Sequence, residues 1–362
     1  MSAVDSDEGL RRIVAAALTA PSGDNCQPWR YAWDGAVLQV TRDAERARHA
    51  VDHLGHASLL TLGCVLEAIA LAAGQEGLGA EARLSLDEPG GRWASVRLSP
   101  GGGSADPLAG AIARRATDRR LYRGGSLDHE VFAAIRGDAA AAGACGIRFV
   151  DRPSRELVDY IARADGYVLR HEEVYRDLLR WVRMSQREVE ETRDGVSWRT
   201  SGLELPETRA LALFRHPRAW SALNRVGLYR ATPVLARLQI ASSAALSCVT
   251  VRSRRPEDVV AAGRLAYRAW LRLNRAGHGV QPLTLASMLA YTSAVAELPA
   301  WVAPDLRALL RGGRGVLARA FGMGDEELPV WMFRTGISGP LPERLRTLRL
   351  PVDRVLTIER PG

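Results

Sequence analysis

Two long apolar segments that lie 200 residues apart constrain the fold of this chain more than any other feature. Residues 57–73 and 260–276 are each largely apolar, which predicts two helices that are buried on more than one side. Four positions agree in register at this offset: Gly63, Leu71, Gly77 and Gly79 correspond to Gly263, Leu271, Gly277 and Gly279. A period of this length predicts duplication of a whole domain. The simpler alternative is two unrelated helices that both end at glycine.

The length of the chain agrees with two folding units. At 362 residues it exceeds one ordinary domain, and 47% apolar with 25% charged residues is typical of a globular protein. Segments 82–86 and 281–285 follow the two apolar helices and are predicted to be strands. A loop rich in Gly, Pro and Ser precedes residue 107, so we expect the boundary between the halves near Asp106. Further helices are predicted over 8–18, 107–115 and 154–189, the last with Gly166 as its expected break, and further strands over 37–41 and 93–98.

The basic residues exclude several chemistries. The net charge is +8, and because the chain contains no lysine, all 49 basic residues are arginines. A Walker A loop, a lysine Schiff base and a Ser-Lys dyad are therefore excluded. Arginines alternate with acidic residues instead of forming one block, and no RNA-binding or zinc-finger pattern accompanies them, which argues against nucleic-acid binding.

Cysteine usage and hydropathy predict a cytoplasmic protein without a metal site. The four cysteines are scattered and form no C-x-x-C pair, so neither a metal centre nor a disulfide framework is expected. Residues 1–9 contain three acidic side chains and no apolar core, unlike a signal peptide. The longest uncharged stretch, 276–296, is too polar to span a bilayer.

The segment P-S-G-D-N-C-Q-P-W, residues 21–29, is the first that could carry chemistry. A turn at its start is followed by Asn25 and Gln27, whose amides can donate and accept hydrogen bonds at once, as the edge of a flavin or a base requires. The alternative interpretation is a plain turn in which Ser22 or Asn25 caps a helix.

A second segment, R-R-A-T-D-R-R at 114–120, could bind phosphate. In an extended chain Arg115, Thr117 and Arg119 project to the same side, and two guanidiniums that flank a hydroxyl can bond several phosphate oxygens. The alternative is a solvated run of charges. A third segment, R-T-L-R-L-P at 346–351, indicates little by itself.

Together these segments resemble the FMN-dependent nitroreductases. Residues 21–29 resemble the family's S-P-S-x-x-N-x-Q-P-W motif, and 115–119 resemble its R-x-S-x-R phosphate motif. In ordinary members the phosphate motif comes first and a homodimer builds two flavin sites. Here it follows by 86 residues (115 − 29), an order that resembles the double-length, Acg-like branch, in which a fused pseudo-dimer retains one site.

This resemblance implies an α+β fold of two nitroreductase-like halves, 1–106 and 107–362, with antiparallel-rich mixed sheets flanked by helices. The first half would carry the Q-P-W motif and the second the phosphate motif, with a lid around 190–205. At the positions that match the family's motifs, the phosphate would be held by Arg115, Thr117, Arg119 and Arg349. The isoalloxazine would be contacted by Pro21, Ser22, Gly23, Asn25 and Gln27. The loop near flavin N5 would be formed by Pro282, Leu283 and Thr284.

Two positions depart from the family pattern. Leu285 stands where a glycine is expected after the N5 loop, and Thr347 stands where ordinary members have a lysine. Either Arg346 replaces that lysine or the phosphate has one cation fewer.

The resemblance implies an FMN-dependent oxidoreductase that takes electrons from NAD(P)H and passes them to a small electron-poor acceptor, or oxidises an amino-acid or peptide-like substrate. No general base and no metal ligand is predicted, and the partners would be small molecules, not nucleic acid or membrane. The unit would be a monomeric pseudo-dimer or a homodimer. The alternative is a lidded FMN-binding or FMN-sequestering protein with little turnover, the lid being residues 193–202 with Trp198 near the centre. A helical scaffold without cofactor is a third interpretation.

Overall fold

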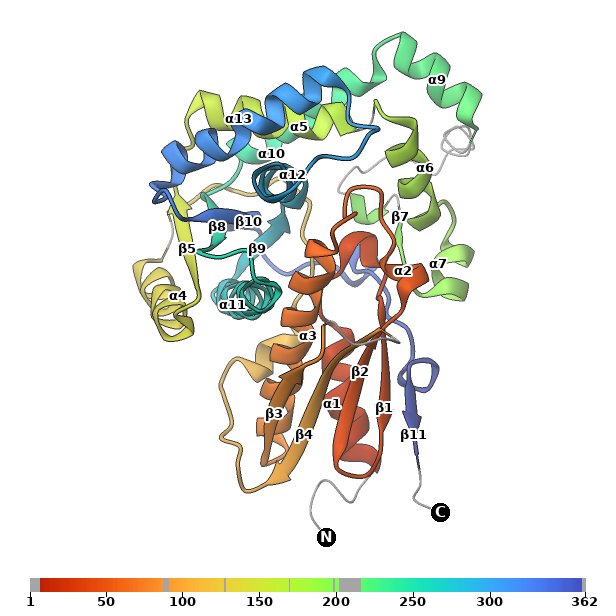
Figure 1. The fold of residues 1–362 in the computed structure, drawn as a ribbon, viewed down its shortest axis with the longest axis vertical. Helices are drawn as coiled ribbons and strands as arrows, with labels where there is room; N and C mark the ends of the chain where they lie inside the picture. The colour runs from red at the N-terminus through yellow and green to blue at the C-terminus, as the bar shows by residue number, and fades with distance from the viewer. Residues whose placement is uncertain are drawn as a thin grey trace.

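The computed structural model describes residues 7–86, 91–126, 128–168, 170–197, 199–201 and 216–359. Within these residues two large β-sheets, with helices packed on and between them, and a small two-stranded sheet form the fold (Figure 1). The α+β fold that the sequence predicts is confirmed. Trp198 and residues 202–205 of the predicted lid lie outside the described residues.

The first sheet comes mainly from the N-terminal part of the chain. Its strands are β1 (Trp29–Trp33), β2 (Val37–Arg42), β3 (Leu78–Leu84), β4 (Arg92–Pro100) and β11 (Leu356–Ile358), in the order β11-β1-β2-β4-β3. All neighbours are antiparallel except the parallel pair β1 and β11. Alternate residues of β1 are buried because successive side chains of a strand point to opposite faces. The accompanying helices are α1 (Asp7–Leu18), α2 (Ala44–Ala47) and α3 (His56–Gln75).

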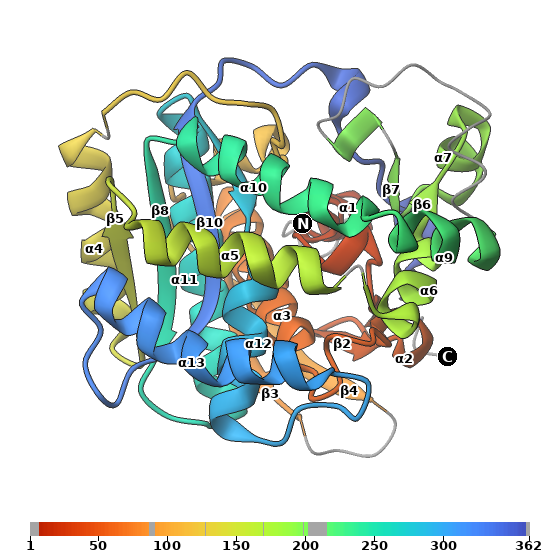
Figure 2. The same cartoon turned by 90° about the horizontal axis from the view of Figure 1, so that it is seen from above.

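The second sheet lies between two layers of helices. Its strands are β5 (Cys145–Val150), β8 (Ala245–Val251), β9 (His278–Pro282) and β10 (Leu328–Ile337), all antiparallel and in the order β5-β8-β10-β9. One face is covered by α4 (His129–Ala142) and α11 (Pro256–Arg275). The other is covered by α5 (Arg155–Val168), α10 (Ala231–Ala241), α12 (Thr284–Val295) and α13 (Pro304–Phe321), as Figure 2 shows.

The two sheets share one topology. The order β1-β2-β4-β3 matches β5-β8-β10-β9, and the long apolar helix follows the second strand of each set, α3 after β2 and α11 after β8. These helices cross at paired glycines: a Cβ on Gly63 would lie 2.1 Å from the carbonyl oxygen of Val260, and one on Gly263 would lie 2.2 Å from that of Leu60. The contacts are reciprocal, as in an interface between twofold-related copies. The predicted duplication into a pseudo-dimer is confirmed.

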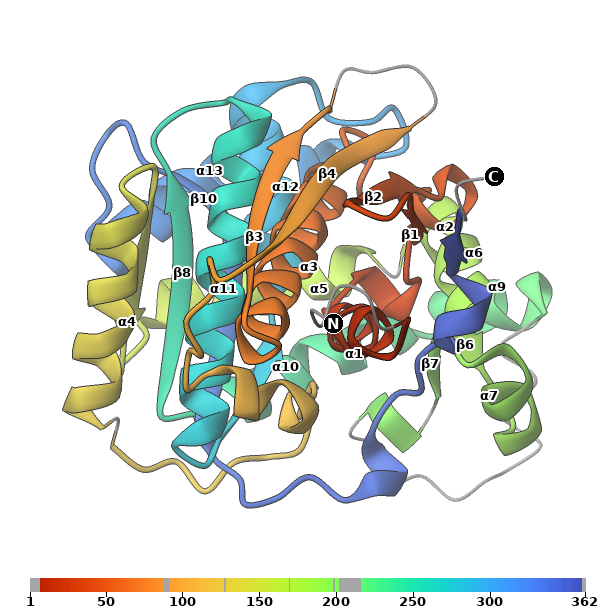
Figure 3. The ribbon, with the colours of Figure 1, turned by 90° about the horizontal axis from the view of Figure 1, so that it is seen from below.

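Helix α3 lies in the middle of the core, between α1 and α11 (Figure 3). Among the described residues it alone is long and apolar enough to cross a membrane by length and composition, yet 83% of its apolar window is buried inside the protein. Burial on several sides is what its all-round apolar sequence predicts.

Several predicted elements differ in type or extent. The segment predicted as a helix over 107–115 is a 3-10 helix, Ala109–Arg114, closed by bonds such as Ala111 N to Leu108 O at 2.9 Å. Strands β3 and β9 start four and three residues before the predicted positions 82 and 281, because each begins directly after a turn at a left-handed glycine, Gly77 or Gly277. The predicted strand 281–285 ends at Pro282, and α12 starts at Thr284.

The predicted helix over 154–189 is three helices, and it does not break at Gly166. After α5 come α6 (Glu172–Trp181) and α7 (Gln186–Thr192). Between them β6 (Val182–Arg183) pairs in parallel with β7 (Val196–Ser197), a tertiary pairing that overrides helix propensity. The remaining elements are α9 (Pro217–Arg225) and the 3-10 helices Gly23–Asn25, Arg199–Ser201, Leu228–Arg230, Glu343–Leu345 and Val352–Arg354.

The C-terminal strand crosses between the halves. Although β11 falls in the segment 107–362, it pairs with β1 of the first sheet, with Tyr31 opposite Leu356. A division of the chain into two contiguous segments therefore does not describe sheet membership at the C-terminus. The boundary near residue 106 stays a prediction.

Candidate functional site

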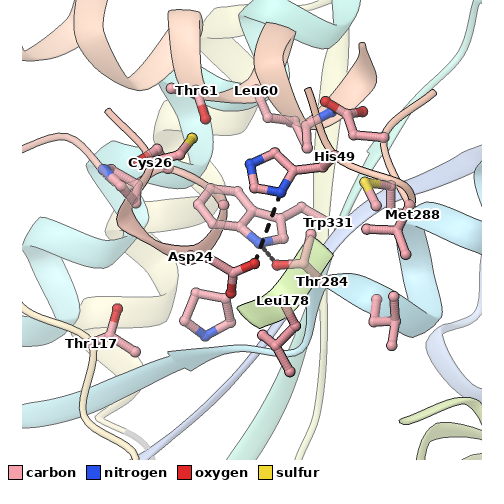
Figure 4. A pocket seen from close by; sticks show the side chains of 18 of the residues that line it. Asp24, Cys26, His49, Leu60, Thr61, Thr117, Leu178, Thr284, Met288 and Trp331 are labelled. Carbon is pink, nitrogen blue, oxygen red and sulfur yellow. Dashed lines mark hydrogen bonds and ion pairs between the residues drawn. The ribbon is translucent and has the colours of Figure 1, made fainter. Parts of the chain in front are cut away.

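A cavity of about 470 Å³ is lined by elements from both halves. This volume lies within the range of about 300–1,000 Å³ that small-molecule sites occupy. Its walls come from the loop 21–28, helices α3, α6, α10 and α12, and the side chain of Trp331 on β10 (Figure 4). The arrangement places the Q-P-W segment opposite residues of the second half.

Three non-glycine residues of the loop 21–28 have left-handed backbone conformations. The φ angles are 46° at Asp24, 57° at Asn25 and 51° at Gln27. Each such residue costs on the order of 1–3 kcal/mol, and such strain gathers at functional sites where the surroundings enforce it. Pro21, Ser22 and Gly23 line the cavity, and their predicted contact with an isoalloxazine ring stays a prediction.

The surroundings that enforce this loop are backbone groups of the second half. Asn25 Nδ2 donates to the carbonyls of Gly195 and Leu348, both at 3.0 Å. Gln27 Nε2 donates to Arg193 O at 2.9 Å, and Gln27 Oε1 accepts from Leu350 N at 2.8 Å. These bonds hold the loop in place, and neither amide is among the residues that line the cavity, so contact of Asn25 and Gln27 with a cofactor stays a prediction.

The predicted phosphate residues divide into two groups. Thr117 and Arg119 line the cavity, and Arg119 also donates to Thr200 O at 2.9 Å. Arg115 does not line it. Its buried guanidinium lies 4.6 Å from the ring of Trp270, Nε donates to Thr19 O at 2.9 Å, and Nη1 makes no hydrogen bond within the described part of the chain.

Arg349 joins Arg115 at the C-terminal end of α1. Its Nε donates to Leu18 O at 2.8 Å and Nη1 to Asn25 Oδ1 at 2.6 Å and Thr347 Oγ1 at 2.7 Å. Burial, together with nearby Arg115, lowers the pKa of Arg349 to about 9. Arg346 donates to the carbonyls of Ala113 and Arg115, so it stabilises the backbone at the start of the phosphate motif.

The segment predicted to approach flavin N5 is split by the start of α12. Pro282 and Thr284 line the cavity, whereas Leu283 is packed into the core of the second half. Thr284 Oγ1 accepts a hydrogen bond from Trp331 Nε1 at 2.9 Å (Figure 4). The N-terminus of α12 lies at this wall, and its partial positive charge favours an anionic group in the cavity. Leu285, at the position of the family's glycine, also lines the cavity.

Five aspartate and histidine side chains that line the cavity have no counterpart in the sequence prediction. They are Asp24, His49, Asp52, Asp165 and Asp177. His49 Nδ1 lies 3.5 Å from Asp177 Oδ2 and 3.9 Å from Asp24 Oδ2. Burial raises the pKa of Asp165 to about 7. Asp24 lies within a recognised motif, and the other four lie outside the motifs and show no metal-ligand or catalytic spacing.

The known proteins that this chain is similar to include a curated mycobacterial protein, matched in two strains. No family model matches the chain. The curated protein "Putative NAD(P)H nitroreductase acg" of Mycobacterium tuberculosis, in strains CDC 1551 and H37Rv, is 32% identical over 115 residues, 30% of this chain and 34% of that protein. The chain resembles the Acg-like nitroreductases. The match spans about a third of the length of these relatives.

Similar solved structures include the FMN and NADPH-dependent nitroreductase NfnB from Sphigopyxis sp. strain HMH, with 13% identity and a TM-score of 0.36 over 71% of this chain and 100% of that one. A BluB-like flavoprotein from Clostridium difficile 630 has 12% identity and a TM-score of 0.38, with the same coverage of both chains.

Proposed function

We propose that this chain binds one FMN in the cavity between its halves and transfers electrons from NAD(P)H to a small electron-poor acceptor. The observation that carries the proposal is the uncompensated positive charge near the phosphate motif. Within the described residues no ion pair is formed by Arg119, which lines the cavity, or by Arg115 and Arg349 of the same predicted phosphate site, and Arg115 Nη1 lacks an acceptor. A buried cation without an acceptor is costly, so this end of the site favours an anion such as a phosphate.

The remaining walls fit the other parts of FMN. Pro21, Ser22 and Gly23 offer a compact surface for a flat ring, and the N-terminus of α12 would stabilise negative charge on it. When bound, FMN would supply the electron chemistry, and the protein would supply position and charge. The curated relative, named as an NAD(P)H nitroreductase, supports the same donor class.

Titration of the protein with FMN, followed by quenching of flavin fluorescence, tests the binding step. Replacing Arg119 by Ala removes a charged donor from the cavity and should weaken binding by about 10–100-fold, which corresponds to about 1.5–3 kcal/mol. Arg155→Ala is the matched control, because this side chain is 97% exposed on α5. Binding that is equal in all three proteins, or absent from the unmodified chain, overturns the proposal.

A second candidate, an FMN-binding protein with little turnover, is favoured by the contacts of residues 193–197 and 199–201. Gly195 N donates to Asn25 O at 3.2 Å, and Arg193 Nε donates to Arg349 O at 2.9 Å. Arg119 donates to Thr200 O, so this segment also touches a cavity residue. A covering segment held by so many bonds would restrict access. Rapid reduction of the bound flavin by NAD(P)H in anaerobic stopped flow would eliminate this candidate.

The site requires no second subunit, since both walls belong to one chain. We therefore propose a monomeric pseudo-dimer as the active unit, acting on small molecules in the cytoplasm. Analytical ultracentrifugation of the FMN-loaded protein tests the oligomeric state, and a dimer that dissociates with loss of FMN would contradict it.

A further inference from the structure

His49 has one nitrogen held by carboxylates and the other left without a partner. Its side chain is only 8% exposed and lines the cavity. The Nδ1 side faces Asp24 (Figure 4) and also Asp177. Within the described residues the buried Nε2 makes no hydrogen bond. A buried ring nitrogen without a hydrogen-bond partner destabilises the folded protein by about 1–3 kcal/mol. The direction in which Nε2 points therefore indicates where a ligand could form the missing hydrogen bond.

Gly23 leaves space beside this buried nitrogen. A Cβ at Gly23 would lie 3.7 Å from His49 Nε2, in ordinary van der Waals contact, so any larger residue would fill the space along the ring edge. Gly23 itself lines the cavity, in the strained loop of the Q-P-W segment. The glycine therefore keeps large side-chain atoms away from Nε2 on the side of the loop that lines the cavity.

The groups around His49 favour its charged form. Asp177 on α6 is fixed by Ala50 N, which donates to its Oδ2 at 2.8 Å. Asp24 and Cys26 face the ring from the loop, Asp52 lies close in the same segment, and the ring of Trp181 lies 5.8 Å away. Burial lowers the pKa of His49, but the bond to Asp177 and the proximity of Cys26 and Asp24 outweigh it and raise the pKa to about 10. His49 is therefore an imidazolium at neutral pH.

We propose that His49 is a catalytic proton donor, which transfers the Nε2 proton to the oxygen of an acceptor reduced in this cavity. The inference rests on the proposed flavin function and adds the chemical class of the acceptor. That class consists of molecules whose reduction leaves an oxyanion, such as quinones.

The step balances with one proton from the protein. When bound, reduced flavin would supply the hydride, two electrons and a proton, that converts the quinone to its phenolate. The resulting phenolate oxygen forms an O–H bond as the Nε2–H bond of His49 breaks. The neutral imidazole then regains a proton from water, and the products are hydroquinone and oxidised flavin. Asp177 and Asp24 act through His49 as positioning residues, because they hold the ring and its Nδ1 proton.

The test measures, in anaerobic stopped flow, how fast pre-reduced, FMN-loaded protein transfers electrons to two different acceptors. Menadione needs a proton on reduction, whereas ferricyanide takes single electrons and needs none. His49→Gln keeps a side-chain N–H but cannot release a proton, so the ratio of the menadione rate to the ferricyanide rate should fall about 100-fold. His53→Gln is the control: it lies four residues away, is exposed and does not line the cavity, so the ratio should not change.

Histidine NMR gives a readout that is independent of turnover. His49 should titrate with a pKa of about 10 in the unmodified protein, and its pKa should fall in Asp177→Asn. If His49→Gln does not fold, Gly23→Ala replaces it, because the added methyl should cover Nε2 and lower the same ratio. An unchanged ratio in a folded, FMN-loaded variant overturns this inference and leaves the flavin function intact. Failure of the unmodified protein to bind FMN, or of its flavin to be reduced, overturns the flavin function instead.

Discussion

Replacing Gly63 by Ala tests the pseudo-dimer core directly. The new Cβ would lie 2.1 Å from Val260 O and 2.8 Å from both Arg264 N and Gly263 Cα. All three neighbours are backbone atoms, so no change of rotamer relieves the clash. Reaching an ordinary contact of 3.4 Å requires α3 and α11 to separate locally by about 1.3 Å (3.4 − 2.1). Overpacking of this kind lowers the free energy of unfolding by about 1–3 kcal/mol, and the better helix propensity of alanine raises it by at most about 1 kcal/mol.

Urea denaturation followed by circular dichroism measures this cost. We expect Gly63→Ala to lower the free energy of unfolding by about 2 kcal/mol, and Gly263→Ala to lower it similarly, because the reciprocal contact is 2.2 Å. Gly137→Ala in α4 is the control: nothing lies within 4 Å of its Cβ position, so it should stabilise the protein by up to about 1 kcal/mol. If Gly63→Ala is as stable as Gly137→Ala, the two helices do not cross as described.

Two further predictions concern buried carboxylates. Burial raises the pKa of Asp165 from its ordinary 3.8 to about 7, so the folded state binds more protons than the unfolded state in this window and stability falls as pH rises through it. The free energy of unfolding of Asp165→Asn should therefore equal that of the unmodified protein near pH 4 and exceed it at pH 8 by up to about 4 kcal/mol. Equal melting temperatures of the two proteins at pH 8 would contradict this. Asp194 is paired at 2.5 Å with both Arg46 and Arg183, and although burial opposes its charge, these bonds lower its pKa. The ion pairs of Asp194 stabilise the folded state above the ordinary pKa of the carboxyl, and this stabilisation is lost as pH falls through the lowered pKa. Asp194→Asn should therefore reduce the free energy of unfolding by about 3–5 kcal/mol at pH 7 and by progressively less in acid. A difference in melting temperature that stays constant with pH would contradict this role of Asp194.

The sequence predicts the architecture well because the relevant signals are local or periodic. The apolar segments 57–73 and 260–276 form helices α3 and α11, and their glycine register marks the point where they cross. The order of the two motifs indicates a site between the halves, and Pro21, Thr117 and Arg119 do line one cavity. These features follow from apolar periodicity, glycine spacing and the order of short motifs, all of which can be read along the sequence.

The sequence does not predict side-chain direction inside the site, because that depends on distant segments. Asn25 turns away from the cavity to bond Gly195 and Leu348, which lie 170 and 323 residues further along the chain. Arg115 turns toward the end of α1 for the same reason. His49 and Asp177 are 128 residues apart (177 − 49) and meet only through tertiary packing, so no spacing rule connects them.

An anaerobic titration of the FMN-loaded protein with NAD(P)H asks whether flavin held between the halves accepts electrons. We expect the visible flavin absorbance to bleach in full with about one equivalent of the donor, and to return when menadione is added. A bound flavin that stays oxidised in excess NADH and NADPH would contradict it.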